Sequence, residues 1–290
     1  VSVSTMSPSK SKMSAFTCVS AIAGCYTKTA TMKLKDKTII VTGSTMGIGE
    51  AIARRCVAEG ARVLIHGLEE RELGEALCAE LGEAAALHLD DLSDAAAPVR
   101  IIAAAVEAFG SIDGLVNNAA IVAQGNLEDT TTEHFDRFLA VNTRAPMFLI
   151  KEALPYLEKS QGAVVNIGSV NAYCGEENLL PYSISKGGLQ TMTRNLGDTL
   201  HRRGIRVNQV NPGWVLTKQE QQRRMDQGMA ENWPTRIPVA YSPARRLITP
   251  EEIASTVIHF LSAEVGPISG AVVDLEQYPM IGRNPLKHLE

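Results

Sequence analysis

The sequence predicts an α/β fold in which a doubly wound parallel sheet forms a single domain. Two observations predict it. From Lys37 onward, short apolar runs of strand length alternate with longer segments whose apolar residues recur at helical spacing. Segments rich in glycine or polar residues directly follow several of the apolar runs, which is where folds of this class bind their ligands.

The first half of the chain gives three units of strand and helix. A short run dominated by Ile, Val, Leu or Ala marks each strand, and we expect strands at residues 38–41, 62–65 and 85–89. Apolar residues at helical spacing mark the helices, which we expect at residues 48–59, 69–81 and 95–109. Turns at Gly60 and Gly110 separate two of these helices from the next strand.

The second half repeats the pattern with longer helices. The same signals predict strands at residues 114–116, 162–167, 205–210 and 271–275. They predict helices at residues 132–157, 181–203 and 251–262, with one or two further helices within 218–231. Strands that alternate with helices pair in parallel through right-handed crossovers, so helices should cover both faces of a Rossmann-like sheet.

Two stretches depart from this alternation. Residues 1–31 are rich in Ser, Thr and Ala, and Met32 begins a run that would serve as a natural start just before a strand. We therefore expect 1–31 to be a disordered or non-native extension, with a transit peptide as the alternative, and 32–290 to be the domain. Within 214–249 the pairs Trp233-Pro234 and Ile237-Pro238 break helices, so this stretch is interpreted as an excursion that covers the substrate.

Composition excludes several classes of function. The formal net charge is -4 and only 5% of residues are aromatic, so neither a basic field nor stacking platforms favour nucleic acid as a partner. No apolar run is long enough to suggest a membrane span. The cysteines are scattered, without a CxxC pair or a histidine cluster, so we expect no metal, no disulfide framework and a reducing, cytoplasmic location. They are Cys18, Cys25, Cys56, Cys78 and Cys174.

A glycine-rich loop follows the first predicted strand. It reads Thr42-Gly43-Ser44-Thr45-Met46-Gly47-Ile48-Gly49. Glycines at this point let the backbone turn tightly and approach a pyrophosphate at the N-terminus of the next helix. The spacing is G-x-x-x-G-x-G, and it lacks the Lys and Ser/Thr of a P-loop, so a dinucleotide is favoured over simple turn residues.

Tyr182 and Lys186 lie one helical turn apart in a predicted helix. Residues i and i+4 share a helix face, so the ammonium can favour the phenolate and lower a tyrosine pKa that is ordinarily about 10. Such a phenol can act as an acid or base near neutrality. The same spacing also occurs by accident in many helices, so the surrounding motifs have to show whether this pair is catalytic.

Those motifs make the chain resemble the short-chain dehydrogenase/reductase family across residues 34–276. Besides the glycine loop, they are Asn117-Asn118-Ala119-Ala120, Ser169 thirteen residues before Tyr182, and Asn211-Pro212-Gly213, in the family's order. The resemblance implies hydride transfer between a nicotinamide cofactor and an alcohol or ketone, and a homo-oligomer, commonly a tetramer or dimer.

The resemblance also assigns roles. Tyr182 would exchange a proton with the substrate oxygen, Lys186 would lower the pKa of Tyr182 and hold the nicotinamide ribose, and Ser169 would bond the same substrate oxygen. Asn142 would hold a water that links Lys186 to solvent, or would simply bond nearby backbone. Asn117 would line the adenine ribose, and Asp91 would accept from adenine unless it or Asp90 caps the next helix. The full set implied for cofactor binding is Gly43, Thr45, Met46, Gly47, Ile48, Gly49, Gly67, Leu68, Asp91, Leu92, Asn118, Ala119, Tyr182, Lys186, Pro212, Gly213, Val215 and Thr217.

The choice between NAD and NADP depends on the end of the second strand. Members that use NAD carry an acid there, whereas this chain has Gly67 followed by Leu68. Glu69 and Glu70 would repel a 2′-phosphate, so NAD is favoured, while His66 leaves NADP as an alternative cofactor. Two other departures are Ala120, where the family has glycine, and Asp274-Leu275-Glu276-Gln277, where many members have Asp-Gly-Gly.

The substrate is predicted from polarity. Segments expected near the site are more polar than a steroid or acyl-chain slot needs, which favours a sugar or polyol. They contribute Asn171, Tyr173, Glu176, Glu177, Asn178, Trp214, Lys218, Gln219 and Glu220. One alternative is a ketoacyl or steroid-type carbonyl reductase, for which the arginines in 218–246 could form a basic patch. Another is a dinucleotide-sensing regulator without catalysis, against which the intact Ser169, Tyr182 and Lys186 argue.

Overall fold

The computed structural model describes residues 32–173 and 176–280. The prediction for residues 1–31, with Cys18 and Cys25, lies outside the described residues, as does Cys174. Cys56 and Cys78 are both free thiols. No helix in the described part of the chain is long and apolar enough to cross a membrane.

Seven parallel strands form one sheet in the order β3-β2-β1-β4-β5-β6-β7. Their bounds are β1 Thr38–Val41, β2 Arg62–Gly67, β3 Ala85–Leu89, β4 Gly114–Asn117, β5 Ala163–Ile167, β6 Arg206–Pro212 and β7 Val272–Leu275. The strand order reverses between β1 and β4, which creates a crevice at the carboxyl ends of the strands. The predicted doubly wound parallel sheet is therefore confirmed.

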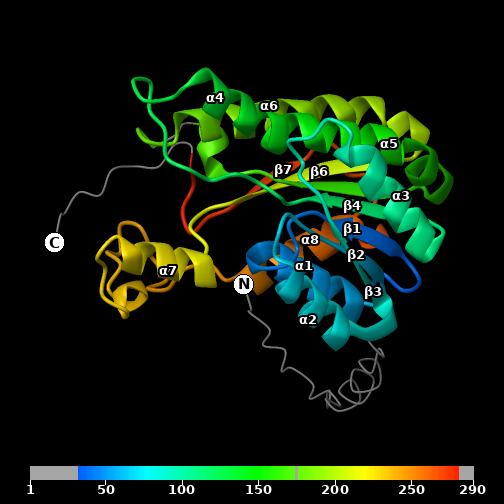
Figure 1. Cartoon of the computed structure of the whole chain (residues 1–290), viewed down its shortest axis with the longest axis horizontal. Coiled ribbons are helices and arrows are strands. Elements are labelled where there is room, and N and C mark those ends of the chain that lie inside the picture. Colours follow the sequence, from blue (N-terminus) through cyan, green and yellow to red (C-terminus); the bar gives the residue numbers. More distant parts are fainter. Residues whose placement is uncertain (1–31, 174–175, 281–290) are drawn as a thin grey trace, which may run out of the picture. The chain divides into compact units, whose positions relative to one another are not determined.

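Helices cover both faces of the sheet (Figure 1). On one face lie α1 Gly47–Ala58, α2 Arg71–Leu81 and α8 Pro250–Leu261. On the other lie α3 Ala97–Phe109, α4 Thr132–Leu139, α5 Ala145–Ser160 and α6 Leu180–Thr199. Two apolar cores result, one on each side, and β1 contributes Ile39 and Val41 to one core and Ile40 to the other. Successive side chains of a strand point to opposite faces of the sheet, and both faces of β1 are buried, which explains why β1 has no polar side.

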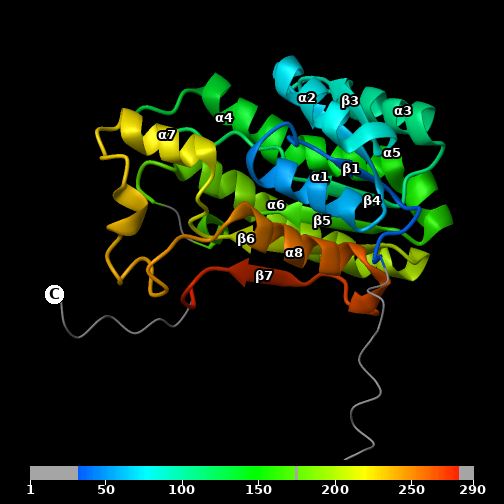
Figure 2. The same ribbon diagram turned by 90° about the horizontal axis from the view of Figure 1, so that it is seen from below.

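The excursion between β6 and α8 lies beyond the carboxyl ends of the strands. It contains α7 Lys218–Asp226, followed by a short 3₁₀ turn at Trp233–Thr235. Figure 2 shows α7 beyond the sheet, at the same end of the fold as α4. Arg246 pairs with Glu252 of α8, and the side chain of Gln277 bonds the backbone of Ala244 and Arg246, so the excursion is tied down at its far end.

Two predicted helices are wrong in detail. Residues 132–157 form α4 and α5 with a five-residue π-helix between them, Ala140–Arg144, and α5 runs on to Ser160. Residues 181–203 end as an α-helix at Thr199, and a 3₁₀ turn at His201–Arg203 follows before Gly204 at φ +77°. Hydrophobic spacing detects a helix, but it does not detect a local change in helix type.

Candidate active site

A cavity of about 1640 Å³ lies at the carboxyl ends of the strands. The loops that follow β1, β2, β3, β4, β5 and β6 all contribute residues to its lining, and the excursion forms one wall. Single drug-sized ligands occupy roughly 300–1,000 Å³. The cavity therefore has room for a dinucleotide and a second small molecule side by side.

The glycine loop folds tightly because side chains would not fit there. A Cβ on Gly43, whose φ is +60°, would lie 2.9 Å from the Cα of Ala119. A Cβ on Gly49 would lie 2.1 Å from the carbonyl oxygen of Gly43. The amide of Asn118 donates to the carbonyl oxygens of Thr42 and Gly43, both at 2.9 Å, and so fixes the loop against β4.

The start of α1 suits a negatively charged group. The N-cap residue Met46 offers no side-chain cap, so the first N–H groups of α1 are free to bond a ligand. A helix N-terminus carries a partial positive charge, and pyrophosphate is an established partner for it. These residues fit the pyrophosphate of a dinucleotide.

His66 supports the loop from β2 as a neutral imidazole. Its Nδ1 accepts from the N–H of Gly43 at 3.2 Å, and burial lowers the pKa of His66 to about 4, with His88 adding to the shift. The other ring nitrogen is buried without a partner among the described residues, and His66 lines the cavity.

The carboxylate of Glu70 folds back over the end of β2. It accepts from the backbone N–H of Leu68 at 3.1 Å and from the hydroxyl of Thr45 at 3.4 Å. Burial would raise the pKa of Glu70, but hydrogen bonds from nearby backbone N–H groups lower it, so the group is ionised at neutral pH. A Cβ on Gly67 would lie 2.9 Å from this carboxylate. Glu70 thus occupies space that a side chain at position 67 would need.

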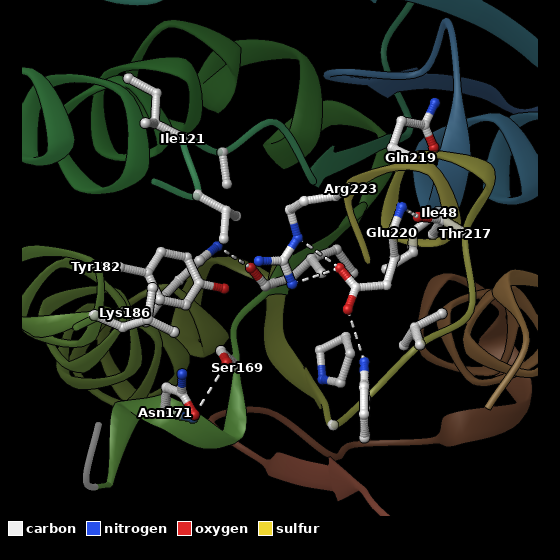
Figure 3. Close-up of a pocket in the computed structure, with 18 of the residues that line it drawn as sticks. Ile48, Ile121, Ser169, Asn171, Tyr182, Lys186, Thr217, Gln219, Glu220 and Arg223 are labelled. Carbon is white, nitrogen blue, oxygen red and sulfur yellow. Dashed lines mark hydrogen bonds and ion pairs between the residues drawn. The ribbon is translucent and has the colours of Figure 1, made fainter. Parts of the chain in front are cut away.

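Ser169, Tyr182 and Lys186 meet at the inner part of the cavity. Ser169 caps the 3₁₀ turn after β5, while Tyr182 and Lys186 come from the first turns of α6 (Figure 3). Tyr182 is 8% exposed and Lys186 only 2%. The Nζ of Lys186 lies 5.8 Å from the centre of the Tyr182 ring and donates to the carbonyl oxygen of Ile167 at 2.7 Å.

The expected lowering of the Tyr182 pKa is wrong for this structure. Burial raises the pKa of Tyr182, and a hydrogen bond with Ser169 opposes that effect only in part. Burial also lowers the pKa of Lys186 to about 7, so its charge is itself reduced near neutrality. Helical spacing placed the two groups together correctly, but it gave no measure of how strongly both are desolvated.

The chain is similar to proteins of known activity in sequence and in fold. Residues 43–276 match a family model described as enoyl-(acyl carrier protein) reductase. Dehydrogenase/reductase SDR family member 4 of Sus scrofa is 35% identical over 247 residues, which are 83% of this chain and 86% of that protein. L-rhamnose 1-dehydrogenase (NAD(P)(+)) of Azotobacter vinelandii is 32% identical over 248 residues, covering 83% and 95%.

A solved structure is similar as well. A crystal structure of 3-ketoacyl-(acyl-carrier-protein) reductase from Brucella melitensis, complexed with NADH, has a TM-score of 0.73 and 28% identity, covering 83% of this chain and 97% of that one. The chain belongs to the short-chain dehydrogenase/reductase family. It is an NAD(P)-dependent oxidoreductase.

Of the cofactor residues expected for this short-chain dehydrogenase/reductase, Gly47 and Asn117 do not line the cavity. Gly47 has a φ of +61°, which the turn before α1 needs. Those that line the cavity are Gly43, Thr45, Met46, Ile48, Gly49, Gly67, Leu68, Asp91, Leu92, Asn118, Ala119, Tyr182, Lys186, Pro212, Gly213, Val215 and Thr217. Asp91 also accepts from the N–H of Ser93 at 2.8 Å. The N-cap of α3 is Ala96 and has no side-chain cap, so the alternative that Asp90 or Asp91 caps that helix is wrong.

The side chains of Asn142 and Asn117 do not line the cavity and are bonded within the protein. Asn142 bonds both the N–H and the carbonyl of Ile121, and it donates to the hydroxyl of Ser185. Its side chain therefore bonds nearby backbone, as the alternative interpretation held. Asn117 is buried and donates to Asn166 at 2.8 Å, which places it in the sheet interior and not beside a ribose.

Arg137 of α4 and Trp233 of the excursion line the cavity but were not predicted from sequence. The sequence offered Arg223, Arg224 and Arg236 only as part of a basic patch for the ketoacyl or steroid-type alternative, and all three line the cavity. Lys218 and Tyr173, expected near the substrate, do not line it. Because excursions of irregular structure have no periodic pattern, nothing in the sequence indicated which of their side chains turn inward. No cluster of three metal-ligating side chains occurs within the described ranges.

Proposed function

We propose that this oxidoreductase interconverts a secondary alcohol and a ketone on a hydroxylated, sugar-like substrate, with NAD as the preferred cofactor. The observation that carries the reaction type is the meeting of Ser169, Tyr182 and Lys186 in one cavity with the glycine loop. The nicotinamide, when bound, accepts or supplies the hydride. The remaining steps belong to side chains of this chain.

Tyr182 and Ser169 handle the substrate oxygen. The Ser169 hydroxyl holds that oxygen and stabilises the negative charge that develops on it. Because burial raises the pKa of Tyr182, its phenol is protonated at neutral pH and ready to donate to a ketone oxygen. In the oxidation direction the phenolate is needed, and Lys186 beside the ring favours it in the fraction of molecules in which Lys186 is protonated.

Replacing Tyr182 tests the catalytic assignment. We expect Tyr182→Phe to lower kcat by roughly 10²- to 10⁴-fold, because one proton transfer is lost. Cofactor affinity, measured by nucleotide titration, should stay close to that of the parent. Tyr156→Phe on α5 removes a hydroxyl outside the cavity and should keep full activity. Turnover by Tyr182→Phe at the parental rate would refute the assignment.

The preference for NAD is supported by Glu70. An ionised carboxylate at the end of β2 can accept from the adenosine ribose diol, and it repels a 2′-phosphate. With Gly67 lacking a side chain, Glu70 reaches this place from the first turn beyond the strand. The likeness to an NADH complex is compatible with this choice.

Exchange of Glu70 tests the cofactor preference. We expect the ratio of kcat/KM for NAD over NADP to fall about 10- to 100-fold in Glu70→Ala, the range that one charge-assisted hydrogen bond supplies. Glu69→Ala is the matched control, because Glu69 does not line the cavity. Initial rates of nicotinamide absorbance with both cofactors measure the ratio. A wild-type preference for NADP would contradict the proposal.

A ketoacyl or steroid-type reductase is the second candidate, favoured by the family model's description and by the solved relative. Its basic patch is weakened by pairing: Arg246 bonds Glu252, and Arg223 and Arg224 both bond Glu220. Faster turnover of a ketoacyl thioester than of any sugar or polyol would favour this candidate over the first.

A further inference from the structure

One wall of the cavity is built around a single carboxylate. Glu220 of α7 accepts four hydrogen bonds: from the indole of Trp214 and the Nε of Arg224, both at 2.9 Å, and from the Nε and Nη2 of Arg223 at 2.8 and 2.6 Å. Burial would raise the pKa of Glu220, but these partners lower it. The carboxylate is therefore ionised and has its acceptor positions filled. We call Trp214, Glu220, Arg223, Arg224 and Trp233 the α7 wall; all five line the cavity.

Aromatic stacking holds the α7 wall in place. The guanidinium of Arg224 lies 5.0 Å from the ring centre of Trp214, and the rings of Trp214 and Trp233 stack at 5.5 Å with 19° between their planes. Trp214 thus has contacts with a cation and with a second ring, so substrate binding needs little further ordering of the wall. Trp233 is only 6% exposed, and its indole N–H is buried without a partner in the described part of the chain.

The hydrogen-bonding groups left over on the α7 wall are donors. Arg223 uses Nε and Nη2 on Glu220, which leaves its third nitrogen available to a ligand, whereas the indole nitrogen of Trp233 is enclosed by the protein. Two guanidinium groups face one carboxylate, so the wall carries a net positive charge. Figure 3 shows Arg223 pointing into the cavity from the α7 side and Tyr182 pointing in from the opposite side.

The far rim of the cavity has the opposite character. Glu176 and Glu177 line it, both exposed, together with Asn171 and Asn178. Carboxylates and amides of this kind accept from hydroxyl groups and repel anions. A molecule that spans the cavity would be stabilised by an anionic end at the α7 wall and by hydroxyl groups elsewhere.

We infer that the substrate carries an oxyanion, a carboxylate or a phosphate, on a hydroxylated carbon chain, and that the α7 wall binds the oxyanion through the third guanidinium nitrogen of Arg223. This inference rests on the proposed function and narrows its substrate class from sugars and polyols to sugar acids or sugar phosphates. A guanidinium N–H donates to the oxygens of a carboxylate and of a phosphate alike, so the wall alone does not distinguish between these two oxyanions.

The pyrophosphate of the cofactor is the competing partner for Arg223. Gln219, one turn earlier on α7, lies beside the glycine loop: its Oε1 is 3.4 Å from the position of a Cβ on Gly47. One observation favours the substrate as the partner of Arg223. The free N–H groups at the start of α1 already suit the pyrophosphate, which leaves Arg223 for the anionic end of the substrate.

Matched substrate pairs test the inference by kinetics. Aldonates such as D-gluconate and sugar phosphates such as D-glucose 6-phosphate are compared with the corresponding alditols, at constant ionic strength, with NAD and with NADP. We expect a higher kcat/KM for the anionic members. In Arg223→Gln this value should fall about 10- to 100-fold for the anionic substrates and much less for the alditols. Lys218→Gln is the control, because Lys218 is an exposed cation of the same helix outside the cavity.

Fluorescence provides a readout that does not need turnover. The chain has two tryptophans, Trp214 and Trp233, and both belong to the α7 wall. In Tyr182→Phe saturated with NAD, we expect aldonate or sugar phosphate to change the tryptophan emission saturably, unlike the alditol or sodium chloride at equal ionic strength. Adding Arg223→Gln should weaken this binding at least about tenfold. A thermal melt of each variant shows that Glu220 still holds α7 through Trp214 and Arg224.

The outcomes separate the two proposals. Turnover of alditols with no preference for anions overturns the inference and leaves the proposed function standing. An Arg223→Gln defect confined to the KM of the cofactor also overturns it, because the arginine then serves the pyrophosphate. If no substrate of the series is turned over, the proposed function fails, and the fluorescence titration alone decides whether the wall binds oxyanions.

Discussion

Burial determines the protonation of the residues around the proposed reaction. Lys186 is 2% exposed and its pKa is lowered to about 7, which means that the folded protein releases a proton that the unfolded chain keeps. The carbonyl oxygen of Ile167, to which its ammonium donates, is neutral. Such a lysine weakens the fold when charged, so its retention points to a functional demand.

A pH series of Lys186→Met measures this cost. Between about pH 7 and 10.5 the unfolded chain binds one more proton at this site than the folded protein, so stability of the parent rises with pH there. Lys186→Met lacks this dependence. The free energy of unfolding of the variant minus that of the parent should therefore be largest at pH 6 and fall by roughly 1 kcal/mol per pH unit above pH 7. Urea unfolding at pH 6, 7.5 and 9 checks this, with exposed Lys35→Met as the control; a constant difference would contradict it.

At the residue scale, the sequence predicted correctly which groups meet when their relative positions follow from a fixed spacing along the chain. Tyr182 and Lys186 share a helix face and Ser169 ends a strand, so their meeting follows from local geometry and the order of elements. The positions of Glu70 and Trp233 could not be predicted from fixed spacing alone. The position of the Glu70 carboxylate depends on a turn that folds back into the space left by Gly67, and Trp233 lies within an aperiodic excursion.

Among the elements, the β1–α1 unit is the most tightly constrained. Gly49 packs against the carbonyl of Gly43 and the amide of Asn118, so loop, helix and β4 hold one another. Gly187, in the third turn of α6, differs: a Cβ there would have the carbonyl oxygen of Ala172 as its nearest neighbour at an ordinary 3.5 Å. The same chemical change should therefore have opposite effects at the two positions.

Alanine at each glycine tests this contrast. Gly49→Ala forces the loop to move, because a backbone oxygen lies 2.1 Å from the new Cβ, and we expect cofactor affinity to fall at least about tenfold. Gly187→Ala should raise the free energy of unfolding by about 0.5–1 kcal/mol, since alanine is the better helix former. Nucleotide titration and urea unfolding of both variants measure this. Equal cofactor affinities would show that the loop tolerates the methyl group.

Element prediction succeeded where periodicity was strong and failed where the chain changes its hydrogen-bonding pattern. The strands and most helix ends lie within two residues of expectation, because buried parallel strands are short continuous apolar runs. The π-helix at Ala140–Arg144 interrupts a segment whose apolar spacing stays helical throughout. The hydrogen bonds of Asn142 explain the π-helix, but they form only in the folded protein, because their partners Ile121 and Ser185 come from other elements.

At the scale of the whole molecule, a chain of side-chain hydrogen bonds crosses four strands beneath the proposed site, buried everywhere except at its end on β7, where Asp274 is exposed. It starts on β4, passes through α6 and ends on β7. Its members, in order, are Asn117, Asn166, Thr193, Gln209, Asn211 and Asp274, each bonded to the next at 2.7–3.0 Å. The last of them also accepts from Tyr173, which follows Ser169 by one short turn. Sheet and site are therefore linked by polar contacts as well as by the apolar cores.

Thr193→Val breaks this chain at its centre without changing the shape of the side chain. Its hydroxyl accepts from Asn166 and contacts Gln209, so valine leaves two buried groups unsatisfied. We expect a loss of about 2–3 kcal/mol in the free energy of unfolding, because buried polar groups without partners keep their full desolvation cost. Thr199→Val on the same helix removes only an exposed bond to Asn195 and should stay within about 0.5 kcal/mol. Urea unfolding of both variants provides the comparison. Equal losses would mean that the buried chain adds no stability beyond that of an ordinary surface hydrogen bond, and that the apolar cores alone hold β5 and β6 in register beneath Ser169.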